Sequence, residues 1–445
     1  MTDDLLNLAE DVLSRARKLG ADSGDALAVD AQGTDIEMRQ GEIEKLERTE
    51  SRGVGLRVFV GHSSALISGS VFTPESLNRL AETAVAMARA APPDPLAGIA
   101  APDLLARNLP QLDLVSAYLP ESDELKALAL AVEGAALAVP GVSKSGGASA
   151  SASQRKIALV TSAGFAQAYQ RTGVSLSVSA IAGEGTGMER DYDYSAACHF
   201  EDLKTPQEVG KSAGERAVKR LQARKIASQA VTVIYDRRVA SSLLGHLSSA
   251  INGAAIARGT SFLKSKMGQQ IFAKGISVID DPLRQRGLAS RPFDGEGLSS
   301  SRRELIADGI LTGWVLDLRS ARQLGLPPTG NGSRGLGGPP GPSTSNLHLE
   351  PGQLSPEEMI GSLGQGLYIT ELIGNSVNMV TGDYSRGASG FWIENGQLAF
   401  PVSEITIAGN LGDMFMTLEP ADDLIFKSST NAPTCRVEGL TIAGT

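Results

Sequence analysis

The side chains that most often bind transition metals or act as nucleophiles are scarce in this chain. Its 445 residues hold four histidines and two cysteines, namely His62, His199, His246, His348, Cys198 and Cys435. A helical site with two histidines needs them about three to five positions apart on one face. The nearest two histidines belong to different predicted elements, so the chain contains no such pair.

His246 lies on a predicted helix over residues 238–251, at a place where a metal motif could sit. A second ligand would have to lie one turn away on the same face. The side chains at those positions belong to Ser242, Leu243, Ser249 and Ala250. We therefore expect His246 to be a partly buried or interface histidine.

Signals for nucleophilic or nucleotide chemistry are weak. Cys198 and His199 are neighbours on a predicted strand, where adjacent side chains point to opposite faces, so they do not suit a catalytic dyad. Ser389 lacks the G-x-S-x-G frame of a hydrolase nucleophile. Residues 330–335 fit the letters G-x-G-x-x-G but lie between prolines, where no helix N-terminus awaits a phosphate.

Two polar clusters remain as candidate sites, at residues 187–194 and 381–390. Each places tyrosine, aspartate and arginine beside glycines. Backbone groups next to glycine can bind an extended peptide, and tyrosine can stack on it. The alternative is a solvated loop held by local ion pairs.

Composition narrows the class of protein. A formal net charge of −9 argues against general nucleic-acid binding, which requires a basic surface. No apolar run approaches the roughly 18 residues of a membrane span, and the N-terminus lacks the pattern of a signal peptide. Two distant cysteines build no disulfide framework. We expect a soluble, cytoplasmic protein that binds neither nucleic acid nor membrane.

The order of predicted elements repeats once in the first half. A helix, several strands and a second helix are predicted over about 1–95 and again over about 121–225, giving one N-terminal α+β domain at 1–225. The strands are expected as short segments, and the last helix as residues 206–224. Their ranges are 26–30, 35–39, 45–50, 53–60, 63–69, 142–147, 157–161, 165–172, 174–182 and about 190–198.

The second half, residues 226–445, is predicted to be rich in strands with a few helices. Asp308-Gly309 and Asn395-Gly396 lie between alternating apolar residues and predict two hairpins. Residues 261–268 are predicted to be helical, and Cys435 to be buried in a strand over 434–442. Glycine and proline dominate 325–342, which predicts an irregular loop, either mobile or in contact with a cavity or partner.

Several motifs resemble the PmbA branch, also called TldE, of the TldD/PmbA family, and the resemblance covers essentially the whole chain. They lie at 188–192, 293–297, 308–311, 381–388, 391–396 and 401–411. The resemblance implies a cytosolic metallopeptidase built from two homologous subunits, which cleaves unfolded or small peptides, including peptide antibiotic precursors and an antitoxin. The TldD-like subunit carries zinc on a His-Glu-x-x-x-His helix and a C-terminal cysteine.

Those zinc ligands do not carry over to this chain. Aligned on 258–261, the histidine positions fall near Leu244 and Ser249 and the glutamate position near Gly245, with His246 out of register. No cysteine occurs between 400 and 434, and Cys435 lies too far toward the C-terminus. The resemblance thus implies a subunit without its own metal or other cofactor, beside a zinc-bearing TldD-like partner.

We therefore expect this chain to shape a cavity that admits peptides, with no catalytic residue of its own. The residues expected to bind substrate are Asp383, Tyr384, Ser385, Arg386, Glu189, Arg190 and Tyr192. Arg386 is expected either to bind a peptide carboxylate or to pair with Asp383. Alternatives are a homodimeric peptide-binding module, and an enzyme acting alone through Ser385 or Cys198.

Overall fold

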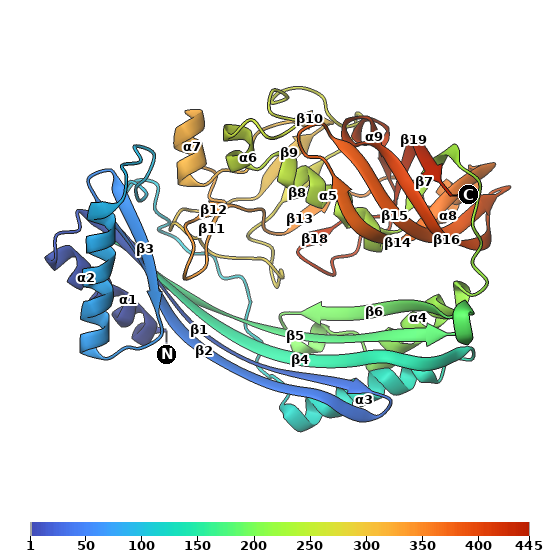
Figure 1. Ribbon diagram of the computed structural model, residues 1–445, viewed down its shortest axis with the longest axis horizontal. Helices are drawn as coiled ribbons and strands as arrows, with labels where there is room; N and C mark the ends of the chain where they lie inside the picture. Colours follow the sequence, from blue (N-terminus) through green and yellow to red (C-terminus); the bar gives the residue numbers. More distant parts are fainter. Residues whose placement is uncertain (1, 445) are drawn as a thin grey trace.

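The computed structural model describes residues 2–444, in which a long curved sheet faces a β-rich second half (Figure 1). Within that range, no helix combines the length and apolar character needed to cross a membrane. The elements of the first half are α1 (Asp3–Lys18), β1 (Ser23–Arg39), β2 (Glu42–Val60), β3 (Ser63–Gly69), α2 (Pro74–Ala90), α3 (Ser122–Leu137), β4 (Val142–Thr161), β5 (Ala166–Ala182), η1 (Gly185–Gly187), β6 (Glu189–Ala197), η2 (Phe200–Asp202) and α4 (Pro206–Lys219).

The two repeated units of the first half share one antiparallel sheet. Its strand order is β3-β2-β1-β4-β5-β6, so each unit contributes three consecutive strands and β1 pairs with β4 at the centre. Each unit also contributes two helices. The predicted α+β class is confirmed, and the two units form one continuous layer.

The strands are longer than the sequence predicted, because glycines and polar residues do not interrupt them. The segments 26–30 and 35–39 are both part of β1, which continues through Gly33. Likewise 45–50 and 53–60 form β2, 142–147 and 157–161 form β4, and 165–172 and 174–182 merge into β5. Backbone hydrogen bonds to both neighbouring strands hold Gly33 in place.

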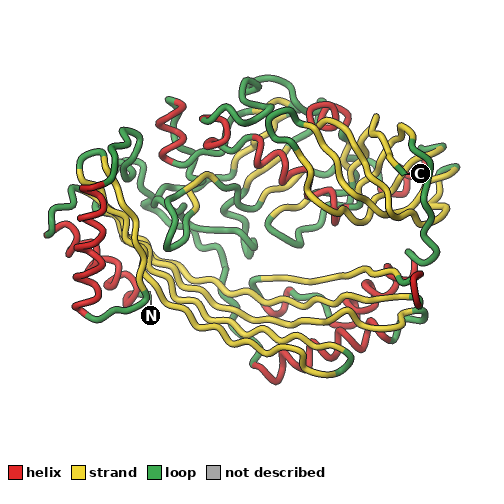
Figure 2. The backbone as a smooth tube through the Cα atoms, viewed as in Figure 1, coloured by secondary structure: helices red, strands yellow, loops and turns green. Residues whose placement is uncertain are grey.

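Helices α1–α4 all cover one face of this sheet, and the other face turns toward the second half (Figure 2). The burial of β5 alternates strictly along residues 172–182, as expected for a strand with a helix-covered face. On the other face, the hydroxyls of Ser149 and Ser177 lie 2.8 Å apart, as do those of Ser151 and Ser175. This second face is therefore polar over its central part.

The second half is built mainly from two sheets. Its elements are β7 (Gln229–Tyr235), α5 (Arg237–Ala250), α6 (Gly253–Ala257), β8 (Val278–Asp280), β9 (Arg303–Ala307), β10 (Ile310–Leu311), α7 (Leu318–Leu324), β11 (Gly332–Ser333), β12 (Gly341–Pro342), β13 (Leu347–Leu349), α8 (Pro356–Gly361), β14 (Gln365–Val377), β15 (Asp383–Glu394), β16 (Gln397–Asn410), α9 (Leu411–Thr417), β17 (Glu419–Pro420), β18 (Thr430–Asn431) and β19 (Cys435–Ala443). The larger sheet runs β16-β15-β14-β7-β19-β17, and an extra β16–β19 pairing closes it into a barrel-like form around the main core.

Both predicted hairpins are confirmed. Asp308-Gly309 joins β9 to β10 and Asn395-Gly396 joins β15 to β16, with positive φ at all four residues. Such turns match the twist of the flanking strands.

One predicted helix was wrong, and another was right but too long. Residues 261–268 form turns, because the Ser261 hydroxyl accepts the Leu263 N–H and donates to the Ala250 carbonyl. Helix α4 ends at Lys219 rather than at 224, and the chain soon turns at Gln222, which has φ +63°. Such left-handed backbone does not continue an α-helix.

The glycine- and proline-rich segment 325–342 lies against the N-terminal sheet. It is not wholly irregular, since β11 and β12 form a short hairpin there. A Cβ atom on Gly55 would lie 2.2 Å from the Leu336 carbonyl oxygen, so the loop backbone rests directly on β2. Arg334 also forms a buried ion pair with Asp25 of β1. The segment thus joins the two halves.

Candidate functional site

The predicted residues 383–386 open strand β15, where alternation places their side chains on two faces. Asp383 is exposed and accepts hydrogen bonds from the Thr381 hydroxyl at 2.6 Å and the Asn410 amide at 3.2 Å. Ser385 shares the face of Asp383, whereas Tyr384 and Arg386 share the other. The four side chains therefore do not line one surface.

Tyr384 points into the core of the second half. Its side chain is only 2% exposed, and its ring meets that of His246 edge-on, with centroids 5.8 Å apart. Among residues 2–444, the Nε2 atom of His246 and the Nε atom of Arg386 are buried without a hydrogen-bond partner, and the hydroxyls of Tyr384 and Tyr235 are also buried. Four polar groups from β7, α5 and β15 thus meet inside an otherwise apolar core.

Arg386 is the cation of this buried group. Among residues 2–444 no carboxylate lies in ion-pair range of its guanidinium, and Asp383 bonds elsewhere, so the expected Arg386–Asp383 pair is wrong. Burial, together with the Arg386 charge, lowers the pKa of His246 to about 4. His246 is therefore neutral near pH 7, and the guanidinium remains available for an anion.

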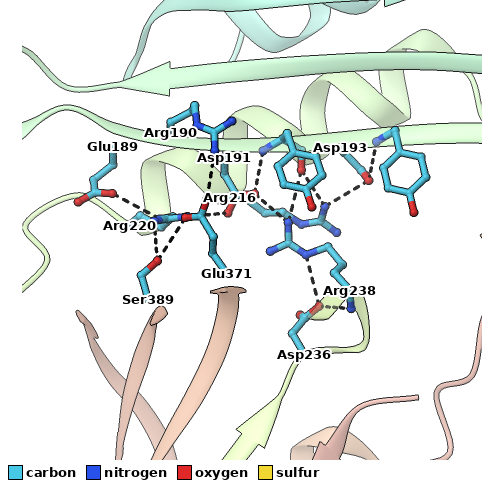
Figure 3. Close-up of polar contacts among 12 residues, drawn as sticks. Glu189, Arg190, Asp191, Asp193, Arg216, Arg220, Asp236, Arg238, Glu371 and Ser389 are labelled. Carbon is cyan, nitrogen blue, oxygen red and sulfur yellow. Dashed lines mark hydrogen bonds and ion pairs between the residues drawn. The ribbon is translucent and has the colours of Figure 1, made fainter. Parts of the chain in front are cut away.

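The second predicted cluster lies where strand β6 meets the second half (Figure 3). Sheet pairing places Arg190 opposite Ile181 and Tyr192 opposite Ser179, so both side chains project from the face that carries the serine hydroxyls. Glu189 projects from the opposite face. Of the three residues that the sequence grouped here, Arg190 and Tyr192 share one surface and Glu189 does not.

Arg220, the residue that directly follows α4, is the centre of one ion-pair group at this junction. Its Nη1 atom lies 2.6 Å from the Glu371 carboxylate of β14, and its Nη2 donates to the Ser389 hydroxyl of β15 at 2.9 Å. Glu189 lies 3.4 Å from its Nε, and Arg190 binds Glu371 at 3.1 Å. Burial raises the pKa of Glu189 despite the attraction of Arg220.

A second group surrounds the buried carboxylates of Asp191 and Asp193. Arg238 of α5 contacts Asp191 at 2.8 Å and lies over the Tyr192 ring. Lys427 contacts Asp193 at 2.7 Å, from the loop before β18. Burial opposes ionisation of Asp193, but the Lys427 hydrogen bond and nearby positive charge outweigh it and lower its pKa to about 2.

The fold therefore ties three residues of the predicted cluster 187–194 into ion pairs between the halves, namely Arg190, Asp191 and Asp193. Reasoning from sequence missed Arg220, Arg238 and Glu371, because each pairs with a residue far away along the chain. Helical or strand spacing carries no signal for such pairs.

Comparison with known families covers most of the chain. Three models of the PmbA/TldA metallopeptidases match in order: domain 1 at 24–88, the central domain at 118–221 and the C-terminal domain at 228–444. The metalloprotease PmbA of Escherichia coli is 37% identical over 442 residues, which cover 98% of this chain and 96% of that protein.

The chain belongs to the PmbA/TldD metallopeptidase family. A proposed modulator of DNA gyrase from Bacteroides thetaiotaomicron has a similar crystal structure, with TM-score 0.91 and 27% identity over 99% of this chain and 98% of that one. TldE from Thermococcus kodakarensis has the same fold, with TM-score 0.86 and 22% identity over 98% and 99% of the two chains.

The family resemblance implies a zinc ion, and the described side chains offer no matching set of ligands for it. Within residues 2–444, no three histidine, cysteine or acidic side chains cluster closely enough to hold a metal. The candidate ligand His246 lies next to the Arg386 cation, which would repel a second positive charge. Cys435 is fully buried, and burial raises its thiol pKa well above the ordinary value, opposite to a zinc ligand.

Proposed function

We propose that this chain is the subunit without zinc in a cytoplasmic peptidase of the TldD/TldE type. In this proposal it pairs with a TldD-like, zinc-bearing partner and shapes the cavity that admits unfolded or small peptides. The observation that carries the proposal is His246 of α5, which burial and the Arg386 charge keep neutral. On the same helix, the zinc-ligand positions implied by the resemblance fall near Leu244 and Ser249, which cannot bind zinc as histidine does.

The inner face of the N-terminal sheet supports a role in holding extended peptides. Arg190 and Tyr192 project from the same face as a ladder of serine hydroxyls on β4 and β5. Hydroxyls can donate to or accept from a peptide backbone without regard to sequence. Such a wall suits substrates that vary in side chains and share an unfolded backbone.

Arg386 has a distinct role in this proposal. Its guanidinium has no carboxylate partner among the described residues, and its planar fork matches a carboxylate better than an ammonium group does. It would bind a carboxylate of the peptide or of the partner subunit. Tyr384 and His246 would hold the arginine in place.

The first experiment compares the chain alone with the chain co-expressed with a TldD-like partner. We expect zinc and cleavage of an unfolded peptide only in the complex, measured by metal analysis and mass spectrometry of a peptide digest. Tightly bound, stoichiometric zinc with peptidase activity in the chain alone would overturn the proposal.

The second experiment replaces Arg386 in the intact complex. Arg386→Ala is expected to slow peptide turnover at least tenfold, and Arg386→Lys to recover only part of it, because lysine keeps the charge but loses the fork. Arg79→Ala, on the exposed face of α2, is the matched control. Unchanged turnover in Arg386→Ala with the complex intact would remove Arg386 from the site.

The same protein samples, the chain alone and the complex, also distinguish the two alternative functions. A homodimeric binding module would bind peptide without a partner and without cleaving it. An enzyme acting alone through Cys198 would work in chelator, but this thiol is 1% exposed and burial raises its pKa, which disfavours the reactive thiolate. Ser385 remains testable by Ser385→Ala in the chain alone.

A further inference from the structure

A cavity of about 190 Å³ lies between the two halves, away from both candidate clusters. Strands β1, β4 and β5 form its floor, and the segments 291–295 and 332–336 of the second half form its roof. The volume exceeds the roughly 10–15 Å³ that one water needs and falls below the roughly 300 Å³ of sites for drug-sized ligands. It therefore suits a ligand of about the size of one amino acid.

The floor is mostly apolar, and Phe293 and Leu336 add apolar side chains to the roof. Leu27 and Val29 of β1 lie opposite Leu159 and Ile157 of β4, all on the sheet face that turns toward the second half. Phe293 closes the roof, and its ring packs edge-on against that of Tyr169 at 5.3 Å. An apolar side chain would be well accommodated here.

The polar rim carries an excess of positive charge. Arg155 of β4 and Arg291 have no carboxylate in ion-pair range among residues 2–444, and the Nε atom of Arg291 is buried without a partner. Arg334 also lines the cavity, but Asp25 neutralises it. Arg155 is exposed and Arg291 is half-buried with its Nε atom removed from water, so a bound anion would stabilise this rim.

Asp294 is the single acidic side chain of the lining, and the charge of Arg291 favours its ionised form. With Arg155, Arg291 and Arg334 against one carboxylate, the lining still carries more positive than negative side chains. Both Asp294 oxygens accept backbone N–H groups, from Glu296 and Leu298 on one side and from Gly332 on the other. The Tyr169 hydroxyl has no hydrogen-bond partner among the described residues and lies in the positive field of Arg171, Arg291 and Arg155. Two arginines and a phenol thus converge on the cavity with donors to spare.

We propose that this cavity binds a small apolar carboxylate, with the carboxylate held by Arg155 and Arg291 and the apolar part against β1 and β4. The carboxylate would bridge the halves, because Arg155 belongs to the N-terminal sheet and Arg291 to the second half. The source is either a free single-residue acid or the C-terminus of a peptide. The proposal is independent of zinc and of the peptidase partner.

Calorimetric titration of the full chain tests this site with matched probes. N-acetyl-L-leucine should bind, whereas N-acetyl-L-leucinamide, which lacks the negative charge, should bind about tenfold to a hundredfold more weakly. Inorganic phosphate should also bind more weakly, because it lacks an apolar part. A hexapeptide ending in a free leucine distinguishes the sources: its binding places a chain terminus in the cavity, and its failure beside acetyl-leucine indicates a small acid.

Variants locate the binding. Arg155→Gln should weaken acetyl-leucine binding at least tenfold without unfolding the chain, because Arg155 is exposed on its strand. Arg291→Gln should do the same, with thermal melting to confirm folding, and Arg79→Gln should leave binding unchanged. Equal binding of the acid and the amide, no binding of the acid, or normal binding by a folded Arg155→Gln protein would each overturn the proposal.

Discussion

Arg220 and Glu371 join the two halves of the molecule through a 2.6 Å contact between the end of α4 and strand β14. The Arg220 side chain is 9% exposed and that of Glu371 20%. Water therefore does little to screen this ion pair. Glu189 and Ser389 also contact Arg220, so one guanidinium binds groups from β6, β14 and β15.

Arg220→Met should lower the free energy of unfolding by about 3 kcal/mol, because it leaves the Glu371 and Glu189 carboxylates without their buried cation. Urea titration followed by the fluorescence of Trp314 and Trp392 measures this loss. Lys211→Gln, which breaks an exposed pair with Glu215 on the same helix, should change stability by less than about 0.5 kcal/mol.

A double variant separates the ion pair from packing. If the pair carries the effect, Arg220→Met combined with Glu371→Gln should lose less than the sum of the two single changes. Additive losses would show that Arg220 acts through its hydrocarbon chain instead.

Local chemistry in the sequence predicted the parts of the fold that depend on neighbouring residues. Asn395-Gly396 predicted its hairpin, because asparagine and glycine tolerate the required positive φ. The strand breaks expected near Gly33 and Gly173 were wrong, since cross-strand bonds from distant segments outweigh the weak local preference of glycine.

The arrangement of side chains in the candidate site could be predicted only in part from the sequence. The motif 381–386 marked the right strand, but only the fold separates Tyr384 and Arg386 from Asp383 and Ser385. His246 entered the site because α5 packs against β14 and its ring meets Tyr384 of the neighbouring β15, a contact that no spacing in the sequence encodes. The cavity beside Arg155 likewise arises where separate segments meet.

Asp193 should make the protein sensitive to acid. Its pKa falls from the ordinary 3.8 to about 2 in the folded chain, so its stabilising effect is complete above about pH 5 and disappears as the pH falls through 2. Asp193→Asn should cost about 2 kcal/mol at pH 7, and the difference from the native chain should vanish near pH 2. Unfolding at both pH values measures it, with the exposed Asp103→Asn as control.

Glu296 should weaken the protein at alkaline pH. Burial, reinforced by the charge of Asp294, raises its pKa from 4.5 to about 8, so the folded state holds a proton that the unfolded state releases. Stability is therefore lost as the pH rises from 4.5 through 8, by at most about 4–5 kcal/mol. Glu296→Gln keeps an acceptor for the Leu318 N–H and should be the more stable protein at pH 9.

Comparing the native chain with Glu296→Gln at pH 5 tests whether ionisation of Glu296 is the cause of the difference at pH 9. At pH 5 the native carboxyl is already protonated when folded, so the two proteins should differ little in their free energy of unfolding. A constant gap between pH 5 and pH 9 would show that the substitution acts on packing rather than on ionisation.

His246 offers a direct measurement on the buried group beside β15. Its pKa of about 4 results first from burial and then from the Arg386 charge, so NMR titration of its ring should show a midpoint near 4. In Arg386→Ala the midpoint should rise but remain below 6.5, because the larger cause persists. The His62 resonance serves as an internal control, since this exposed ring lies at the tip between β2 and β3. A midpoint near 6.5 in the native chain would mean that water reaches His246 and that Arg386 lies elsewhere. That result would also remove the basis for the proposed role of Arg386 in binding a carboxylate.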